Sequence, residues 1–468
     1  MKLTGEQIAA ATGATILAAG PAERPVRATI ASGETGPGDL FFGLPGASRD
    51  GGEYALAALE AGAWGVLARP EHAQAAAAPN TAAAPGTGTR QSFSPDSVRN
   101  DCHAWVLGAE DPLAALQALA REQRRALGVR VVGVTGSVGK TSVKDITRAL
   151  LPGRVHANRE NLNTEIGLPL TILEAPDETE LMVLEMAMRG AGQIAELAAI
   201  AEPDVAVITN VGPVHIELLG SVAAVAAAKA EILDALPAGG VAVAPVQAGE
   251  LEPHLRREDL RILRFGPGGD VEARQVRRRE GVTEAEIATP LGSQLFHFPF
   301  TEAHNLTNAL AAVAAGVGLG IEPAVLADGA ASIGFSRFRG ERLELGEGIV
   351  LVNDCYNANP VSMRAALDHL VSLGAPRTVA VLGEMGELGE GAPAYHREVG
   401  EHARAAGVDV VIGVGEPARG YDPDELVADP GEAAELLAAR LEAGDAVLVK
   451  GSRSVGMEQV AELLVELV

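Results

Sequence analysis

The chain has 468 residues, of which 47% are hydrophobic and 21% are charged, and its formal net charge is −25 at pH 7. This length predicts about three domains, and the composition is that of a soluble globular protein. The acidic excess argues against a nucleic-acid partner, and Cys102 and Cys355 are too few for a disulfide scaffold or a cysteine-ligated metal. We find neither a signal peptide nor an apolar run of the ~20 residues that a membrane span needs, so we expect a cytoplasmic protein without a membrane span.

The first 108 residues have the pattern of a small α/β domain. Thr4–Gln7 is a capping-box sequence that predicts a short helix, and Pro37–Leu44 predicts a turn followed by a buried strand. A helix is expected over Tyr54–Ala61 and a short strand over Trp64–Ala68. Glu71–Asn100 is rich in Ala, Pro, Thr and Gly without periodicity, which predicts a low-complexity surface insertion at about 71–100.

The stretch from 129 to 142 is the most informative in the chain. A β-branched run ends in the turn Thr135-Gly136-Ser137-Val138-Gly139, and Lys140-Thr141-Ser142 and a helical pattern follow it. Backbone N–H groups of such a loop and the helix dipole hold phosphates. Lys140 would reach the β- and γ-phosphates, and the Thr141 hydroxyl would ligate Mg²⁺. Although Val134 replaces the first glycine of the general P-loop pattern, we predict a nucleotide site and take ATP as its nucleotide.

Around this loop, helical and strand patterns alternate. Asp111-Pro112 predicts the start of an amphipathic helix that leads into the loop strand, because Asp suits a helix N-terminus. We assign residues 109–333 to a central domain with further strands at Leu181–Leu184, Val205–Thr209 and Val241–Ala244. Residues 334–468 form a third, Rossmann-like domain with strands at Ile349–Val352, Thr378–Leu382, Val408–Ile412 and Ala446–Val449. This alternation predicts an α/β fold with mostly parallel sheets.

Polar residues follow several of these strands, at the edge where open α/β sheets bind ligands. Glu185 could hold Mg²⁺ or could simply begin a helix. His215, beyond a Gly-Pro turn, is either a ligand or a core histidine. Lys229 lies in an Ala-rich helix, where a surface lysine is the simpler interpretation. His304 and Asn305 open another helix and could serve only to cap it.

The densest polar cluster follows the first strand of the third segment. It places Asp354, Tyr356, Asn357 and Asn359 within a few residues of one another and ends at Pro360. No structural requirement explains so many polar groups in so short a segment, so we interpret the cluster as functional. Two further polar segments follow strands in the same way, with a histidine downstream of the first: Gly383–Gly389 with His396, and Lys450–Arg453.

Taken together, these segments resemble the Mur ligase superfamily, and within it the branch that adds D-alanyl-D-alanine. The matching stretches lie in the expected order over nearly the whole chain: Thr135–Ser142, Asn161–Thr171, Thr209–His215, Ala228–Ile232, Asn353–Pro360 and Leu382–Gly389. The last two are similar to that branch in particular. The Asp-Asn-Pro-Arg motif expected of diaminopimelate- or lysine-adding ligases is absent.

The resemblance implies an ATP- and Mg²⁺-dependent ligase that joins D-alanyl-D-alanine to UDP-MurNAc-tripeptide through an acyl phosphate. Residues 1–108 would hold the UDP end of the substrate, residues 109–333 ATP, and residues 334–468 would close over both. Nothing in the sequence indicates an obligate oligomer, so we expect a monomer. The implied metal ligands are Thr141, Glu185 and His215, and the implied catalytic residues are Lys140, His215 and Lys229, the last carbamylated in this superfamily. The implied nucleotide contacts beyond the loop are Asn305, Arg342, Asp354 and Asn357.

One departure from the family and three alternatives remain. Family members carry Asp-Ser-Arg shortly before Pro-Gly-Asp-Leu-Phe, where this chain has Ala31-Ser32-Gly33, so UDP-sugar contacts are not assigned. A related ligase such as a folylpolyglutamate synthase is disfavoured by the segment Asn353–Pro360. A GTPase lacks support because no guanine-reading Asn-Lys-x-Asp is present. A non-catalytic nucleotide-binding regulator would be expected to lose Lys140, Glu185, His215 or Lys229, and all are retained.

Overall fold

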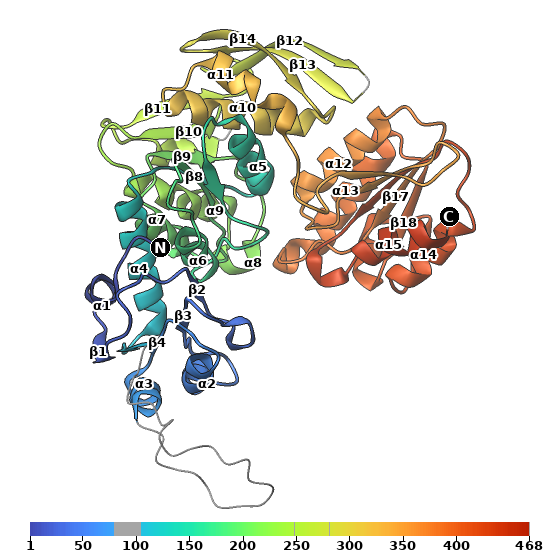
Figure 1. The fold of residues 1–468 in the computed structure, drawn as a ribbon. Helices are drawn as coiled ribbons and strands as arrows, with labels where there is room; N and C mark the ends of the chain where they lie inside the picture. The colour runs from blue at the N-terminus through green and yellow to red at the C-terminus, as the bar shows by residue number, and fades with distance from the viewer. Residues whose placement is uncertain (79–103, 248, 280, 468) are drawn as a thin grey trace, which may run out of the picture. The chain divides into compact units, whose positions relative to one another are not determined.

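The structure, a computed structural model, describes residues 1–78, 104–247, 249–279 and 281–467 (Figure 1). The chain divides into two compact units. Residues 1–131, 154–184 and 196–202 make the first unit, and residues 132–153, 185–195 and 203–468 make the second. Over the described ranges, every helix is too short or too polar to cross a lipid bilayer.

The first unit contains a five-stranded sheet in the order β1-β5-β4-β3-β2, in which β1 alone is antiparallel to its neighbour. Its strands are β1 (Thr15–Ala18), β2 (Arg27–Thr29), β3 (Asp39–Phe42), β4 (Gly65–Ala68) and β5 (Trp105–Gly108). Its helices are α1 (Gly5–Thr12), α2 (Ala55–Glu60), α3 (Pro70–Ala77), α4 (Pro112–Leu127) and α6 (Gly167–Leu173). The predicted capping box is confirmed, since the Thr4 and Gln7 side chains each bond the other's backbone N–H. Strands β3 and β4 are buried along their whole length, as parallel strands usually are.

The predicted low-complexity insertion was wrong over its first residues. Residues 71–77 belong to α3, in which Ala73 and Ala76 are buried. Proline at the first helical position, Glu71 in the first turn and a run of alanines all favour a helix, although the composition resembles a linker. Residues 79–103, which include the rest of the predicted insertion, lie outside the described residues.

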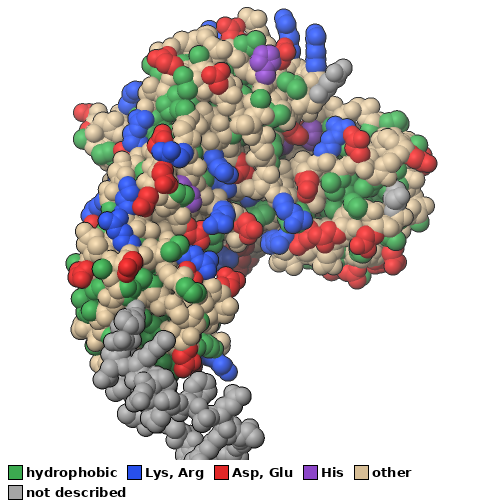
Figure 2. Space-filling model, in the orientation of Figure 1, with side chains coloured by type: hydrophobic (Ala, Val, Ile, Leu, Met, Phe, Trp, Pro, Cys, Tyr) green, Lys and Arg blue, Asp and Glu red, His purple; other side chains and the backbone are tan. Residues whose placement is uncertain are grey.

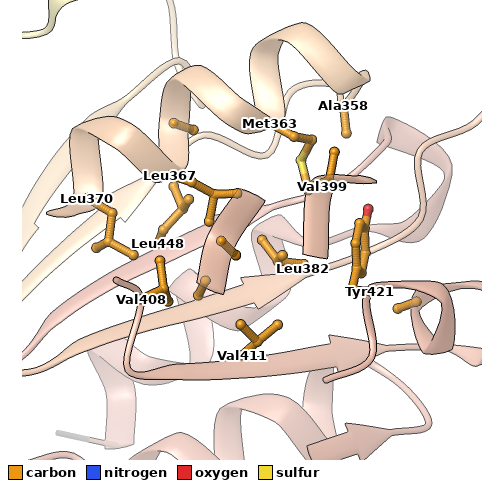
Figure 3. Close-up of a cluster of buried hydrophobic side chains, with 14 of the residues drawn as sticks. Ala358, Met363, Leu367, Leu370, Leu382, Val399, Val408, Val411, Tyr421 and Leu448 are labelled. Carbon is orange, nitrogen blue, oxygen red and sulfur yellow. The ribbon is translucent and has the colours of Figure 1, made fainter. Parts of the chain in front are cut away.

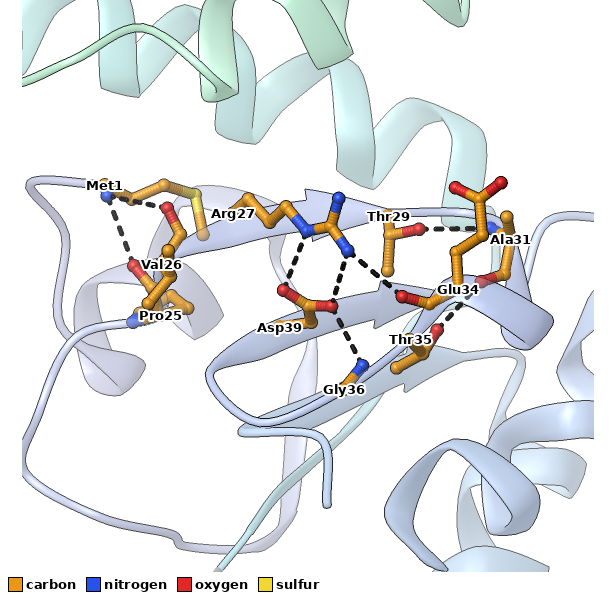
Figure 4. Close-up of polar contacts among 10 residues, drawn as sticks. All are labelled: Met1, Pro25, Val26, Arg27, Thr29, Ala31, Glu34, Thr35, Gly36 and Asp39. Atoms are coloured by element: carbon orange, nitrogen blue, oxygen red, sulfur yellow. Dashed lines mark hydrogen bonds and ion pairs between the residues drawn. The ribbon is translucent and has the colours of Figure 1, made fainter. Parts of the chain in front are cut away.

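The segment that departs from the family pattern is fixed by its own neighbours (Figure 4). Arg27 joins β2 to β3, with Nε 2.9 Å from Asp39 Oδ1 and Nη2 3.1 Å from Oδ2. The same guanidinium donates to a backbone carbonyl of the short helix Ser32–Glu34 at 3.0 Å. The Thr35 hydroxyl donates to the Ala31 carbonyl at 2.9 Å. The backbone here is therefore held without the charged side chains expected of the family.

A six-stranded sheet carries the phosphate loop, in the order β11-β10-β9-β6-β8-β7. The pairings of β7 with β8, β6 with β9, β9 with β10 and β10 with β11 are all parallel, which confirms the predicted sheet type. Its strands are β6 (Arg130–Thr135), β7 (Val155–Ala157), β8 (Leu181–Glu185), β9 (Val205–Ile208), β10 (Val241–Pro245) and β11 (Arg261–Phe265). The helices between them include α5 (Lys140–Leu150), α7 (Gln193–Ala201), α8 (Ile216–Leu219) and α9 (Val222–Ala230).

The second unit also contains a three-stranded antiparallel sheet that we did not predict. It consists of β12 (Glu272–Arg279), β13 (Val282–Thr289) and β14 (Gly292–Phe298), and it lies beside α10 (Ala303–Gly318) and α11 (Pro323–Asp328) (Figure 1). Its buried face alternates along the chain, with Thr283, Ala285 and Ile287 inside. Stacked rings continue this face, since the centroids of Phe296 and Phe298 are 5.4 Å apart.

A second six-stranded sheet has the order β15-β16-β20-β17-β18-β19, with only β15 antiparallel. Its strands are β15 (Glu341–Glu344), β16 (Val350–Asn353), β17 (Thr378–Leu382), β18 (Val410–Val414), β19 (Glu425–Val427) and β20 (Ala446–Lys450). Helices α12 (Pro360–Ser372) and α13 (Ala392–Ala406) pack on one face through residues such as Leu367 and Val399 (Figure 3). Helices α14 (Pro430–Ala438) and α15 (Glu458–Leu467) pack on the other face.

The predicted strand at Val408–Ile412 was misplaced by two residues. Gly407 has φ of 92° and caps α13, and the Val408 N–H donates to the Ala403 carbonyl at 3.0 Å. Residue 408 therefore closes the preceding helix, and the strand begins only at Val410.

Candidate active site

The predicted phosphate loop joins β6 to α5. Gly136 and Gly139 have φ values of 150° and 81°, a region of backbone conformation that favours glycine. Lys140 is the first residue of α5, and its Nζ donates to the Gly136 carbonyl at 2.9 Å, so the side chain folds back over the loop. The unpaired N–H groups of the first helical turn and the Lys140 charge thus lie at one place, which suits a bound phosphate.

The loop is supported by the segment that follows β9. Asn210 Oδ1 accepts from the Val138 N–H at 2.8 Å, and the Ser137 N–H donates to the Asn210 carbonyl at 3.1 Å. The Thr209 hydroxyl donates to the Val138 carbonyl at 2.5 Å. These bonds fix the loop within the protein itself, so the Thr-Asn pair singled out in the sequence has a role in shaping the nucleotide site.

We expect Gly136→Ala to weaken ATP binding by about 100-fold, which corresponds to about 2.7 kcal/mol. A Cβ at this position would lie 1.9 Å from Thr209 Oγ1, so the loop must shift. Isothermal titration with ATP measures the loss. Gly249→Ala is the matched control, because a Cβ there meets nothing within 4 Å, and it should bind ATP as the wild type does. Wild-type affinity in Gly136→Ala would show that the loop does not bind ATP.

Glu185 is the last residue of β8 and is 2% exposed. The alternative interpretation, in which Glu185 only begins a helix, was therefore wrong. The buried Thr141 hydroxyl donates to Glu185 Oε2 at 2.8 Å. Hydroxyl and carboxylate oxygens are the hard ligands that Mg²⁺ prefers, and Mg²⁺ completes its shell with water and phosphate oxygens. In the described ranges no three His, Cys, Asp or Glu side chains converge on a metal site.

His215 precedes α8 and has φ of 53°. Its Nδ1 lies 2.5 Å from Glu387 Oε2, without the angles of a hydrogen bond. Burial lowers the pKa of His215, Lys229 and Lys140 lower it further, and Glu387 opposes them. The imidazole is therefore kept neutral, which is the form that ligates a metal.

Lys229 lies on α9 and is only 1% exposed, so its interpretation as a surface lysine was wrong. Burial, reinforced by the charge of Lys140, holds the pKa of Lys229 well below its ordinary value. Burial also lowers the pKa of Lys140, where Glu185 opposes the shift and Arg339 adds to it. A buried amine that is readily deprotonated is a nucleophile, unlike the hydrated ammonium of a surface lysine.

The polar cluster after β16 is held together by a second buried lysine. Lys450, at the end of β20, donates to Asp354 Oδ2 at 2.6 Å and to the backbone carbonyls of Asp354 and Asn357, each at 3.1 Å. The Lys450 side chain thus holds both Asp354 and Asn357, the two residues of this cluster that we assigned to nucleotide binding.

Asn305 does not cap α10, because the N-cap residue is Glu302. The buried Asn305 amide instead donates to Glu302 Oε2 at 3.4 Å and accepts from Asn308 Nδ2 at 3.2 Å. Asn308 also approaches the phosphate loop, since a Cβ added to Gly139 would lie 2.5 Å from Asn308 Oδ1. Burial lowers the pKa of the neighbouring His304. This helix start therefore lies against the loop.

Arg342 acts electrostatically on His369, whose Nε2 lies 3.4 Å from the Glu302 carboxylate that Asn305 contacts. The Arg342 side chain is 55% exposed on β15 and lies 3.6 Å from the Glu344 carboxylate. Arg339, which we did not single out, is the arginine that acts on Lys140. Its guanidinium stacks on the Tyr356 ring at 4.0 Å from the centroid, and its buried Nε has no partner. No local pattern marked this residue, since it lies in an irregular segment between a short 3-10 helix (Ala330–Ser332) and β15.

Comparison with known proteins identifies the arrangement. Residues 134–316 match the Mur ligase middle domain, and residues 338–453 match the Mur ligase glutamate ligase domain. A UDP-N-acetylmuramoyl-tripeptide–D-alanyl-D-alanine ligase from Synechocystis is 35% identical over 92% of this chain and 90% of its own length. The chain belongs to the MurF family of Mur ligases.

Solved MurF structures share the whole fold. MurF from Acinetobacter baumannii, at 27% identity, covers 99% of this chain and 98% of its own with a TM-score of 0.85. MurF from Thermotoga maritima in complex with ADP, at 31% identity, covers 94% of this chain and 97% of its own with a TM-score of 0.77. The predicted α/β architecture of a Mur ligase is thereby confirmed.

Proposed function

We propose that this MurF family member is an ATP-dependent ligase that joins D-alanyl-D-alanine to the terminal carboxylate of UDP-MurNAc-tripeptide, giving UDP-MurNAc-pentapeptide for peptidoglycan synthesis. The observation that carries the proposal is the buried Thr141–Glu185 pair at 2.8 Å beside Lys140 of the phosphate loop. Since the chain is related over most of its length to ligases of this name, this pair supports the assignment of an ATP site here.

The chemistry requires an activated acyl group, because a carboxylate is a poor electrophile. ATP phosphorylates the tripeptide carboxylate, and the D-alanyl-D-alanine amine attacks the acyl phosphate. A tetrahedral intermediate then expels phosphate. Lys140 neutralises the charge of the transferring phosphoryl group, and the N–H groups of α5 orient it. Exclusion of water protects the acyl phosphate from hydrolysis.

The residues that would hold Mg²⁺ are Thr141 and Glu185, with His215 in the same group. When bound, Mg²⁺ supplies further charge neutralisation at the phosphates. We propose that Lys229 is carbamylated. Its neutral amine attacks CO₂, a C–N bond forms, and one proton leaves for solvent. The carbamate places an anion near the proposed Mg²⁺ ligands, where the unmodified side chain offers only a neutral amine.

We propose three functional regions: residues 1–108 for the UDP end of the substrate, residues 109–333 for ATP, and residues 334–468 for closure over both. We propose a monomer as the functional unit, since nothing in the sequence indicates an obligate oligomer. We place the reaction in the cytoplasm, where ATP is supplied. Acidic and basic side chains are interspersed on the face shown in Figure 2, consistent with small-molecule substrates and no nucleic-acid partner.

The decisive experiment measures ADP and phosphate release with ATP and Mg²⁺. UDP-MurNAc-tripeptide and D-alanyl-D-alanine are supplied separately and together, and the product is identified by mass. We expect release only with both substrates, together with a new UDP-MurNAc-pentapeptide. Comparing tripeptides with diaminopimelate or lysine at the third position then determines the preference.

Either of two results would overturn the proposal. ADP release that is independent of both substrates would leave a nucleotide site without the ligase. Release with another amine in place of D-alanyl-D-alanine would point to a different Mur-type or folylpolyglutamate-type ligase.

A further inference from the structure

A buried histidine supports residues 383–386, the turn that follows the C-terminal end of strand β17. His396 lies on α13 and is 2% exposed. Its Nδ1 lies 2.7 Å from the Ala392 carbonyl, and its Nε2 lies 3.0 Å from the Met385 backbone nitrogen. A carbonyl can only accept and a backbone N–H can only donate. The ring is therefore a neutral imidazole with its proton on Nδ1 and its lone pair on Nε2.

A tyrosine holds the same turn from a second side. Tyr421 is 1% exposed, and its hydroxyl donates to the Gly383 carbonyl at 2.8 Å. Its ring packs against the His396 imidazole with centroids 4.8 Å apart. The fit is close, since a Cβ added to Gly420 would lie 2.7 Å from His396 Cβ. The two rings therefore form one rigid support under residues 383–386.

The loop that follows β20 closes the turn from a third side. The Gly383 N–H donates to the Lys450 carbonyl at 2.8 Å, and the Ser452 N–H donates to the Glu384 carbonyl at 2.9 Å. The Gly386 N–H donates to Ser452 Oγ at 2.8 Å. Apart from the His396 lone pair, every acceptor in these contacts is an oxygen, and none can become a donor-only group on protonation. Burial lowers the pKa of His396, while the Ala392 carbonyl and the Glu384 charge oppose this.

The turn contains one carboxylate, and a second follows it directly. Glu384 lies within it and acts electrostatically on both His396 and Tyr421. Glu387 follows directly, with φ of 61°, and reaches the His215 imidazole. A shift of residues 383–386 would therefore displace a group that contacts a proposed metal ligand.

We infer that His396 is a positioning residue of the ligase: as a neutral acceptor for the Met385 N–H, it fixes the turn that presents Glu384 and Glu387. This inference rests on the proposed function. His396 touches no substrate, and its effect on turnover passes through the backbone of the turn. The feature that matters is the acceptor at Nε2, not the ring as such.

Two substitutions distinguish the effect of the hydrogen-bond acceptor from the effect of the space that the ring fills. His396→Gln places Oε1 as many bonds from Cβ as Nε2 and keeps an acceptor that does not titrate. His396→Leu fills the space but leaves the Met385 N–H buried and unpaired. His402→Leu is the control, because His402 lies on the same helix and pairs only with the exposed Asp368 carboxylate. Thermal unfolding first establishes that all variants fold.

We expect His396→Leu to lower kcat by about 30-fold and to leave KM for ATP within about two-fold of the wild-type value. The kcat of His396→Gln should stay within about three-fold of the wild type, and that of His402→Leu within about two-fold. Hydrogen–deuterium exchange in the peptide covering 383–389 should rise at least about ten-fold in His396→Leu only, with β17 unchanged.

The outcomes are distinguishable. Wild-type turnover in His396→Leu would overturn the inference alone, as would equal loss in the Leu and Gln variants or unchanged exchange at 383–389. Absence of ligase turnover in the wild-type protein would overturn the proposed function, and the inference with it.

Discussion

Replacing Lys140 with alanine is expected to abolish ligation, lowering kcat by at least about 10³-fold while the fold stays intact. Lys140 supplies the positive charge of the phosphate loop at the start of α5, 2.9 Å from the Gly136 carbonyl. No other side chain of the loop carries a charge. Burial lowers the pKa of this amine although the Glu185 charge opposes the shift, so removing the amine should cost the fold little.

Steady-state kinetics with both substrates measure this loss, and circular dichroism with thermal unfolding measures the fold. Arg148→Ala is the matched control, because Arg148 is an exposed residue of the same helix. It should retain turnover within about two-fold. Normal turnover by Lys140→Ala would show that the loop does not serve phosphoryl transfer, and the proposed mechanism would fail.

Replacing Lys229 with methionine is expected to abolish turnover by about 10³-fold and yet to stabilise the protein at neutral pH, by about 1–2 kcal/mol in the free energy of unfolding. Turnover is lost because methionine cannot form a carbamate. Stability rises because methionine fills the same buried space without an amine whose charged form burial disfavours.

The sign of the pH dependence follows from proton linkage. The pKa of Lys229 is depressed in the folded state from the ordinary value of 10.5, so folding releases a proton wherever the unfolded lysine is charged and the folded one is not. Wild-type stability therefore rises with pH up to about 10.5. The advantage of Lys229→Met should be largest at low pH and should vanish above that value.

Denaturant unfolding of the wild type and Lys229→Met at several pH values in CO₂-free buffer measures this difference. A parallel assay removes CO₂ from the wild-type enzyme and restores bicarbonate. Activity should fall and recover, and Lys229→Met should respond to neither step. Full activity in Lys229→Met would exclude the carbamate, and a stability difference that is constant with pH would exclude a depressed pKa.

The parts of the fold that could be predicted were those with a continuous apolar signal. Strand β17 was expected over the residues that it occupies, because Thr378–Leu382 is buried throughout and flanked by polar residues. The sheet β12–β14 was missed because half of each strand faces solvent and β12 is almost wholly exposed, so its arginines resemble a loop. Helix α3 was missed because alanine fits both a helix and a linker.

The residues of the site also fall into those that could be predicted from the sequence and those that could not. Lys140, Thr141 and Glu185 could be predicted because each lies at the end of a buried strand or in the loop that follows one, and parallel topology brings such ends together. The roles of Arg339 and Glu387 depend on segments that meet only in the folded chain, at Tyr356 and His215 respectively. The spacing of these residues in the sequence does not indicate that they are in contact. The burial of Lys229 likewise follows from packing, because alanine occupies every face of its helix and the sequence does not indicate which face is buried.

The support of residues 383–386 by His396, Tyr421 and the loop after β20 has a consequence for how this part of the enzyme evolves. These segments lose their conformational entropy once, when the protein folds, and not again in each catalytic cycle. A loop of this kind tolerates insertions poorly, because a longer loop would displace backbone groups that already have partners: the N–H groups of Gly383, Met385 and Gly386 and the carbonyls of Gly383 and Glu384. Divergence in this segment would therefore proceed by exchange of side chains on a fixed backbone, and relatives should keep the loop length here while the residues between the hydrogen-bonded positions vary.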